Sequence, residues 1–434
     1  MRSVDEHLAR ITSSAVVPRP VKIAISEAQG LMCAEEVLTE RPLPGFDQAA
    51  VDGYAVRAVD VALAGVVAPG PDEAFDAGEA DLDALVPGDP IAVFLPVVGD
   101  VEPGSRTPIR LQPRQAVRVE TGAPMPTLAD SVVPLRWTDG ATQKVRIAHG
   151  VDSGSYVRRV GDDVQPGDVA VRAGEIIGPA QVGLLAAVGR SRVLVHPRPR
   201  LSVIAVGSEL VDIDRVPGQG QVYDVNSYAL AAAARDAGAD VNRVGIAERD
   251  PARLREIVEA QLIRSEIVVI CGAVGGSSSK AIADALSELG DLDIARIAMH
   301  PGSVQGFGRL GRDEVPTFLL PANPVSALVT FEIMVRPLIR IALGKREPWR
   351  RNIKARTVGP VASVEGRTGY LRGQLMREER TGAFMVQVIG GSSTGTSHLL
   401  AELAEANCLV VVPSAAAKLD PGDEVDVMFL AQRG

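Results

Sequence analysis

Four acidic residues stand in glycine-containing turns of the 434-residue chain: Asp52, Asp162, Asp163 and Glu209. Carboxylate oxygens in such turns are ligands that Mg²⁺ accepts beside a phosphate. An Asp-Gly pair such as Asp52-Gly53 is more often only a tight turn, so solvated turn residues are the alternative interpretation.

A second candidate is the glycine- and serine-rich segment from Gly272 to Lys280. Successive backbone N–H groups, at Gly272, Gly275, Gly276 and Ser277, can form an anion-binding nest, and Lys280 at a helix start would add a positive charge. The alternative is a tight strand-to-helix turn that binds nothing. Neither a Walker A sequence nor a Gly-x-Gly-x-x-Gly fingerprint is present, which argues against nucleoside triphosphatases and dehydrogenases.

These residues follow apolar runs that are typical of buried parallel strands. The runs begin at Leu201, Glu266 and Pro316, and helical segments separate them, with Asn226 and Asn323 as expected caps and Pro324 in a first turn. Alternating strands and helices predict a doubly wound α/β domain, in which ligands bind at the carboxyl ends of the strands.

The remainder of the chain shows short strands between prolines and glycines. We therefore expect an α/β plus β protein with a β-rich domain I, a β-rich inserted domain II, an α/β domain III and a C-terminal β-barrel domain IV. The predicted bounds are 1–45 with 144–180 for domain I, 46–143 for domain II, 181–343 for domain III and 344–434 for domain IV.

Composition limits the possible partners and compartments. A formal net charge of -9 argues against a nucleic-acid binder and against a polybasic membrane anchor. The three cysteines are far apart and are expected to be reduced. Neither a signal peptide nor an apolar run long enough to span a membrane is apparent, so a soluble, cytoplasmic protein without direct membrane insertion is expected.

Seven motifs together resemble the molybdopterin molybdenumtransferase (MoeA) family, whose vertebrate member forms the E domain of gephyrin. In family order they are 43–57 (LPGFDQAAVDGYAVR), 121–126 (TGAPMP), 159–163 (RVGDD), 206–209 (VGSE), 220–226 (GQVYDVN), 320–327 (LPANPVSA) and 403–407 (LAEAN).

The resemblance implies an elongated homodimer of four-domain chains, whose active cleft lies between domain III of one subunit and domain II of the other. It also implies a reaction in which molybdate is inserted into adenylylated molybdopterin with release of AMP, and Mg²⁺ as a cofactor. Asp52 and Thr121 match catalytic positions, Asp162 replaces the usual glutamate, Glu209 matches the strand-end glutamate, and Lys280 corresponds to the family's lysine. Asp162 and Glu209 are the implied metal ligands.

The cleft also departs from the family pattern. Ser208 stands at a usual aspartate, the turn at 300–303 has lost two lysines around Pro301, and the 272–280 loop is shortened. Two functions therefore remain open. One is a molybdenum-inserting enzyme. The other is a gephyrin-like scaffold that binds the peptide tail of a division protein such as FtsZ, or of a membrane receptor, at the domain III and IV interface. A nucleotide- or anion-binding module is a third interpretation.

Overall fold

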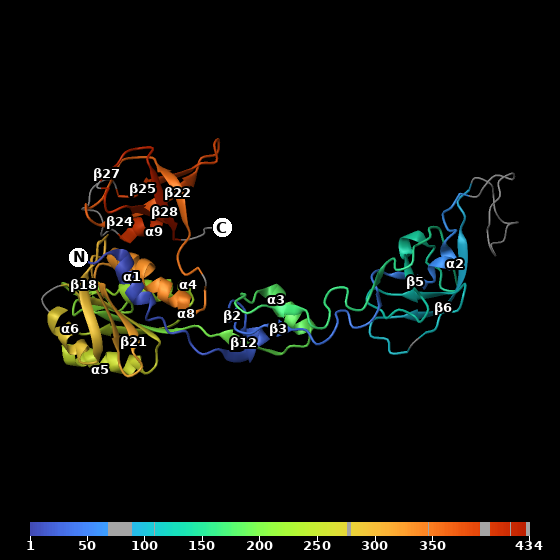
Figure 1. Ribbon diagram of the computed structural model, residues 1–434, viewed down its shortest axis with the longest axis horizontal. Coiled ribbons are helices and arrows are strands. Elements are labelled where there is room, and N and C mark those ends of the chain that lie inside the picture. The colour runs from blue at the N-terminus through green and yellow to red at the C-terminus, as the bar shows by residue number, and fades with distance from the viewer. Residues whose placement is uncertain are drawn as a thin grey trace.

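The computed structural model describes residues 1–67, 89–107, 109–275, 279–345, 347–390, 400–416 and 418–430. Its shape is elongated (Figure 1): domains III and IV lie at one end, domain II lies at the other, and domain I forms a narrow bridge between them. Among the described residues, no helix combines the length and the apolar character that crossing a membrane requires.

Domain III is built on a six-stranded sheet in the order β16-β13-β17-β21-β20-β18. The first four strands are parallel and the last two are antiparallel to their neighbours. In this order the strands are β16 (Asp240–Ala247), β13 (Arg200–Val206), β17 (Ile267–Val274), β21 (Val315–Pro321), β20 (Val304–Leu310) and β18 (Gly290–Arg296).

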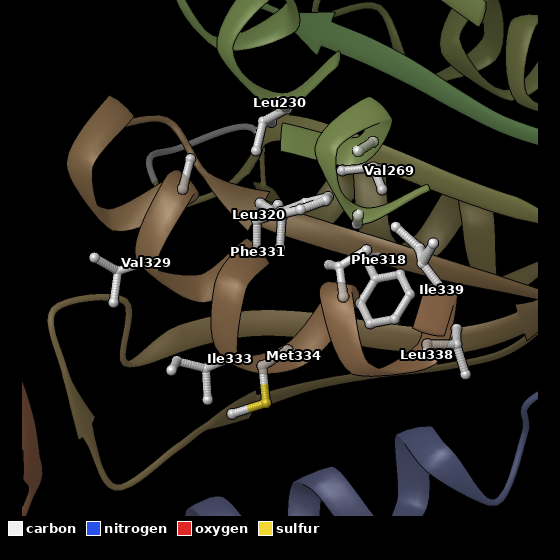
Figure 2. Packing of buried hydrophobic residues seen from close by; sticks show 14 of the residues in the cluster. Leu230, Val269, Phe318, Leu320, Val329, Phe331, Ile333, Met334, Leu338 and Ile339 are labelled. Atoms are coloured by element: carbon white, nitrogen blue, oxygen red, sulfur yellow. The ribbon is translucent and has the colours of Figure 1, made fainter. Parts of the chain in front are cut away.

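Helices cover both faces of this sheet, which explains the continuous apolar runs in its strands. Phe318 and Leu320 of β21 pack against Phe331 and Ile339 on one face (Figure 2), whereas Leu319 packs on the other face. The helices are α4 (Asn226–Ala237), α5 (Pro251–Leu262), α6 (Ser279–Ser287), α7 (Pro324–Thr330), the π-helical turn η4 (Phe331–Val335) and α8 (Arg336–Ala342).

The sequence did not reveal strands β16 and β20. In β20, Gly306 and Gly308 interrupt the apolar pattern, but both positions exclude a side chain. A Cβ on Gly306 would lie 2.9 Å from the Leu319 side chain, and one on Gly308 would lie 2.2 Å from the Asp291 carbonyl oxygen. The glycines therefore permit close strand packing rather than marking a turn.

The N-terminal helix α1 (Val4–Thr12) belongs to domain III and not to domain I as predicted. Ser3 caps it in a capping box with Glu6, and Val4 and Ile11 enter the domain III core. Arg2 and Arg10 each donate to Asp293 of β18 at 2.7 Å. These contacts attach the start of the chain to the sheet.

His7 of α1 makes this attachment sensitive to acid. Its side chain is buried and packs edge-on against Phe307 at a ring distance of 6.2 Å. Burial, aided by the charge of Arg2, lowers the pKa of His7 from 6.5 to about 4. As the pH falls from 6.5 towards 4, the unfolded chain therefore gains a proton that the folded chain does not. We expect the free energy of unfolding to fall by up to about 3 kcal/mol across this window and to be fully retained above it.

Urea unfolding at pH 7.5 and pH 5 measures this effect. His7→Phe keeps an aromatic ring against Phe307 but cannot be protonated, so its unfolding midpoint should change less between the two pH values than that of the wild type. An equal loss in both proteins would show that His7 is not the responsible group.

Domain I extends further along the chain than predicted. Strand β12 (Arg192–His196) pairs with β1 (Val21–Ala24) and with β2 (Met32–Cys33). Leu185 of helix α3 (Pro179–Ala187) packs in the same core. The predicted boundary at 181 is therefore wrong, because residues 179–196 bury their apolar side chains in domain I. Its other elements are η1 (Ile25–Glu27) and the pairs β3 (Val37–Leu38) with β11 (Val169–Val171) and β4 (Gln48–Ala49) with β10 (Val157–Arg158).

Domain II contains a five-stranded sheet in the order β8-β5-β7-β6-β9. Strand β9 (Lys144–Ile147) pairs with β6, so the predicted boundary at 144 cuts through this sheet and is also wrong. The other elements are β8 (Ser131–Pro134), β5 (Gly53–Val56), β7 (Ala116–Val119), β6 (Val93–Val101), α2 (Ala58–Val61) and η3 (Leu135–Trp137).

Five strands of domain IV close into a barrel, as predicted. They are, around the barrel, β24 (Thr368–Arg377), β25 (Phe384–Val388), β22 (Asn352–Thr357), β28 (Glu424–Phe429) and β26 (Cys408–Val412). Strand β19 (Met299–His300) of domain III adds to β24 and joins the two domains. The domain also has the pair β23 (Val361–Ala362) and β27 (Lys418–Leu419) and helix α9 (Leu400–Glu405).

All three cysteines are buried and free, as expected.

Candidate functional site

The candidate site has two halves, and the first lies at the carboxyl edge of the domain III sheet. Strands β13, β16, β17 and β21 are parallel, so the residues that follow them meet at one edge. Ser208 and Glu209 follow β13, Gly275 follows β17, and Asn323 follows β21. We call this edge the strand-end half. It is where ligands bind in open α/β sheets.

Glu209 is joined there by an arginine that the sequence did not single out. The Glu209 carboxylate forms an ion pair with the Arg249 guanidinium at 3.2 Å, and both side chains are about one-third exposed. Arg249 lies two residues after the end of β16, a strand that the sequence pattern missed. Ser208, beside Glu209, is exposed.

Of the two predicted helix caps, Asn323 is confirmed and Asn226 is wrong. Asn323 accepts a hydrogen bond from Ser326 N at 3.0 Å and caps α7, with Pro324 as the first helical residue. Asn226 does not cap α4, because the Asp224 carboxylate accepts the hydrogen bond from Ser227 N at 3.0 Å. The Asn226 side-chain amide instead donates to the carbonyl oxygen of Ala322 at 2.7 Å. It thereby ties the start of α4 to the loop after β21.

The sequence also did not predict a network of charged and aromatic side chains at the start of α4. The Arg243 guanidinium contacts Asp212 at 3.1 Å and lies 4.0 Å from the ring centroid of Tyr228. Tyr228 donates to Asp212 at 2.6 Å, and this hydrogen bond, with the Arg243 charge, lowers the pKa of the Asp212 carboxyl. The loop that contains Asp212 includes the short parallel pair β14 (Leu210–Val211) and β15 (Val222–Tyr223). The network thus fixes the loop between Glu209 and α4.

The predicted anion nest is only partly described. Gly272 is buried within β17 at φ +90°, and a Cβ there would lie 2.3 Å from the Val206 carbonyl oxygen. Its role in the structure is therefore close packing of β17 against β13. Gly275 is exposed at φ +81° with open space around it. Lys280 is the exposed second residue of α6. Gly276 and Ser277 lie outside the described residues.

Pro301 lies on the domain IV side of this edge. It is buried, and a cis peptide bond joins it to His300 of β19. A Cβ on the neighbouring Gly302 would lie 2.2 Å from Thr330 Oγ1 and 3.4 Å from the Ser326 carbonyl oxygen. The 300–303 turn therefore packs directly on α7, and Pro301 is buried rather than exposed to solvent.

The second half of the candidate site consists of turns at the base of domain II. Asp52 Oδ1 accepts hydrogen bonds from both the backbone N–H and the hydroxyl of Thr121, each at 2.7 Å. Both residues are exposed. These two hydrogen bonds, with a smaller contribution from the Arg118 charge, lower the pKa of the Asp52 carboxyl. The predicted pair therefore forms a carboxylate that stays ionised at neutral pH.

Asp162 belongs to the turn that follows β10. Its carboxylate accepts a hydrogen bond from Arg159 N at 2.7 Å. Strand β10, which leads to Asp162, pairs with β4, and β4 is also bonded to the Thr121 turn through Gly122 N and the Ala49 carbonyl oxygen at 2.8 Å. We call Asp52, Thr121 and Asp162 the turn half.

One chain does not bring the two halves together. Asp52 directly precedes β5 at the domain II end of the molecule, whereas Glu209 follows β13 of the domain III sheet and Lys280 lies in α6, at the other end (Figure 1). Within the described part of the chain, no three histidine, cysteine, aspartate or glutamate side chains form a metal-binding group. Domain I lies between the two halves within one chain (Figure 1), so the predicted metal pair of Asp162 and Glu209 stays a prediction for a site shared by two chains.

Three family models match successive parts of the chain. Residues 2–189 match the MoeA N-terminal region (domain I and II), residues 202–341 match a probable molybdopterin binding domain, and residues 354–430 match the MoeA C-terminal region (domain IV).

Known proteins agree with this assignment over the whole length. The chain is 68% identical over 434 residues to molybdopterin molybdenumtransferase 1 of Mycobacterium tuberculosis, with 100% of both chains covered. It is 34% identical over 436 residues to molybdopterin molybdenumtransferase 2 of the same species, covering 99% of this chain and 100% of that protein. A crystal structure of a molybdopterin biosynthesis MoeA protein from Pyrococcus horikoshii matches with a TM-score of 0.77 and 28% identity, covering 98% of both chains. The chain belongs to the MoeA family of molybdopterin molybdenumtransferases.

Proposed function

We propose that the protein is a molybdopterin molybdenumtransferase, which inserts molybdate into adenylylated molybdopterin and releases AMP. The observation that supports this most strongly is the full-length match at 68% identity to a protein of that name. The turn half retains the Asp52–Thr121 pair with both hydrogen bonds. The comparisons give the gephyrin-like scaffold no better support, and a peptide partner stays a prediction.

The Asp52 carboxylate of the turn half would serve as a hydrogen-bond acceptor and not as a general base. Because Thr121 stabilises the charged form of Asp52, this carboxylate takes up a proton less readily than an ordinary aspartate does. It is suited to accept hydrogen bonds from a substrate or an attacking water and to attract a cation. Thr121 fixes the direction of its lone pairs.

The strand-end half would bind the anionic part of the substrate. Arg249 and Lys280 bring positive charge to the edge where the parallel strands end. The backbone N–H groups at the start of α6 favour the same type of group, since a helix N-terminus attracts phosphate. Glu209 would hold Arg249 in position through its ion pair.

We further propose that two chains complete the site as a homodimer. The two halves lie at opposite ends of one chain (Figure 1), so a single substrate can contact both only if they come from different subunits. A two-fold dimer in which domain II of each subunit faces domain III of the other would create two equivalent sites.

A resident Mg²⁺ stays a prediction, and in the proposed dimer carboxylates of both halves would be available to hold it. This ion prefers octahedral oxygen ligands and usually takes one or two carboxylates with water and substrate phosphates. Asp52 and Asp162 are carboxylates of the turn half, and in the proposed dimer they would face Glu209 of the partner subunit, whose carboxylate is paired with Arg249.

Release of AMP from adenylylated molybdopterin in the presence of molybdate tests the proposed function. The purified protein should turn over this substrate and should restore molybdoenzyme activity in a strain that lacks its own molybdenumtransferase. Folded protein that releases no AMP and fails to complement would contradict the proposal.

A further inference from the structure

A cavity with aromatic walls lies in domain II next to the turn half. Its volume is about 550 Å³. Trp137 and Tyr156 line it, together with the polar residues Asp152 and Ser155. Aromatic residues make up only 3% of the chain, and Trp137 is one of its 2 tryptophans. Two partly exposed aromatic rings in one cavity are therefore notable in this composition.

Neighbouring groups hold the two rings in a fixed arrangement. The ring centroids of Trp137 and Tyr156 are 5.7 Å apart at 76°. The Arg136 guanidinium lies 4.9 Å from the Trp137 centroid and donates to the Tyr156 hydroxyl at 3.3 Å. His149 packs edge-on against Trp137 at 5.7 Å. An aromatic wall that is ordered before binding loses little conformational entropy when a ligand arrives.

The backbone of Tyr156 is also unusual. Its φ is +57°, a left-handed conformation that is rare for a bulky residue. Two neighbouring bonds hold the segment in place, since the Tyr156 carbonyl oxygen accepts from Ala50 N at 2.9 Å and the Ser155 carbonyl oxygen accepts from Val132 N at 3.0 Å. Strained residues of this kind concentrate at binding sites.

The cavity is connected to the turn half through short backbone links. Leu135 N, two residues before Trp137, donates to the Asp52 carbonyl oxygen at 3.1 Å. Ala50, which bonds to Tyr156, lies two residues before Asp52. A ligand in the cavity would therefore lie in the same part of domain II as the Asp52 carboxylate.

Asp152 suggests which type of ring the cavity accepts. Its carboxylate is exposed and forms no hydrogen bond or ion pair with any residue that the structure describes. A carboxylate accepts two N–H donors side by side. The amino-lactam edge of a pterin presents two adjacent donors, whereas adenine presents one donor next to an acceptor, and that acceptor would face a carboxylate oxygen.

We propose that this cavity binds the pterin ring of the substrate, stacked on Trp137 and Tyr156, with the amino-lactam edge donating to Asp152. The inference rests on the proposed function, because that function supplies a pterin as substrate. It assigns the pterin to domain II and leaves the phosphate groups to the strand-end half.

Calorimetric titration of the whole protein with 6-hydroxymethylpterin, and separately with AMP, tests this assignment without any turnover. Trp137→Ala and Asp152→Asn should each weaken pterin binding by about tenfold and leave AMP binding unchanged. Trp137→Phe, which keeps a flat ring, should retain most of the affinity. Trp349→Phe is the matched control, because Trp349 lies between domains III and IV and should bind pterin as the wild type does.

In the Trp349→Phe protein Trp137 is the sole tryptophan, so added pterin should quench its fluorescence. Unchanged pterin affinity in folded Trp137→Ala would overturn the assignment, as would an effect on AMP in place of pterin. The two hypotheses fail in different ways. If the wild type releases AMP in the turnover assay but Trp137→Ala still binds pterin normally, the proposed function stands and the pterin binds at a different site.

Discussion

Replacing Asp52 by alanine is expected to lower the rate of AMP release at least about a hundredfold, while the protein stays folded. Removal of one preorganised electrostatic group commonly has an effect of this size on turnover. Asp52 is exposed, and within the described structure its carboxylate is hydrogen-bonded only to Thr121. Replacing Asp52 should therefore change the thermal midpoint of unfolding little. Single-turnover assays with the wild type and the variant, at equal concentrations of folded protein, measure the change.

Two further variants separate the carboxylate from the groups that hold it. Thr121→Val removes the hydroxyl donor but keeps the backbone donor, so we expect a smaller loss than in Asp52→Ala. Asp139→Asn is a matched control, because Asp139 is an aspartate of domain II that accepts backbone hydrogen bonds away from the turn half. Full activity of folded Asp52→Ala would remove the turn half from the mechanism.

A large effect on stability is expected from a substitution at Gly272. An alanine there would need a left-handed backbone at φ +90° and would place its Cβ 2.3 Å from the Val206 carbonyl oxygen. Neither β13 nor β17 can move away without breaking the pairing between them. We expect Gly272→Ala to reduce the free energy of unfolding of domain III by at least about 3 kcal/mol.

Gly275 provides the matched control, since its φ of +81° is similar but its Cβ would enter open space. Gly275→Ala should therefore show only the cost of the left-handed backbone, roughly 1–2 kcal/mol. Denaturant unfolding of both variants measures the difference. Equal losses would show that backbone conformation, and not the contact with Val206, accounts for the effect at Gly272.

The carboxyl edge of the domain III sheet could be predicted from the sequence because most of its strands are recognisable as continuous apolar runs. Each buried run ends at a polar loop, and Asn323-Pro324 gives the start of α7 correctly. Asn226 failed as a cap because Asp224, two residues earlier, reaches Ser227 N instead. Choosing between two neighbouring cap residues requires the backbone angles of the turn, which local sequence does not determine.

Contacts between distant segments could not be predicted in this way. The pairing of Glu209 with Arg249 depends on β16 lying next to β13, and β16 has no clear apolar alternation. The aromatic cavity depends on Trp137 meeting Tyr156, which are separated along the chain by β9. The domain bounds at 144 and 181 failed for a related reason, since strand partners, and not composition, decide to which sheet β9 and β12 belong.

The central claim is that the turn half and the strand-end half act together across two chains. It is tested most directly by mixing two inactive variants, Asp52→Ala and Glu209→Ala, after unfolding and refolding them together. In a two-fold dimer, each mixed pair has one site with both changes and one site with neither, so random pairing should restore about a quarter of the wild-type rate. Activity that stays at the level of the separate variants, although mixed dimers form, would contradict the claim.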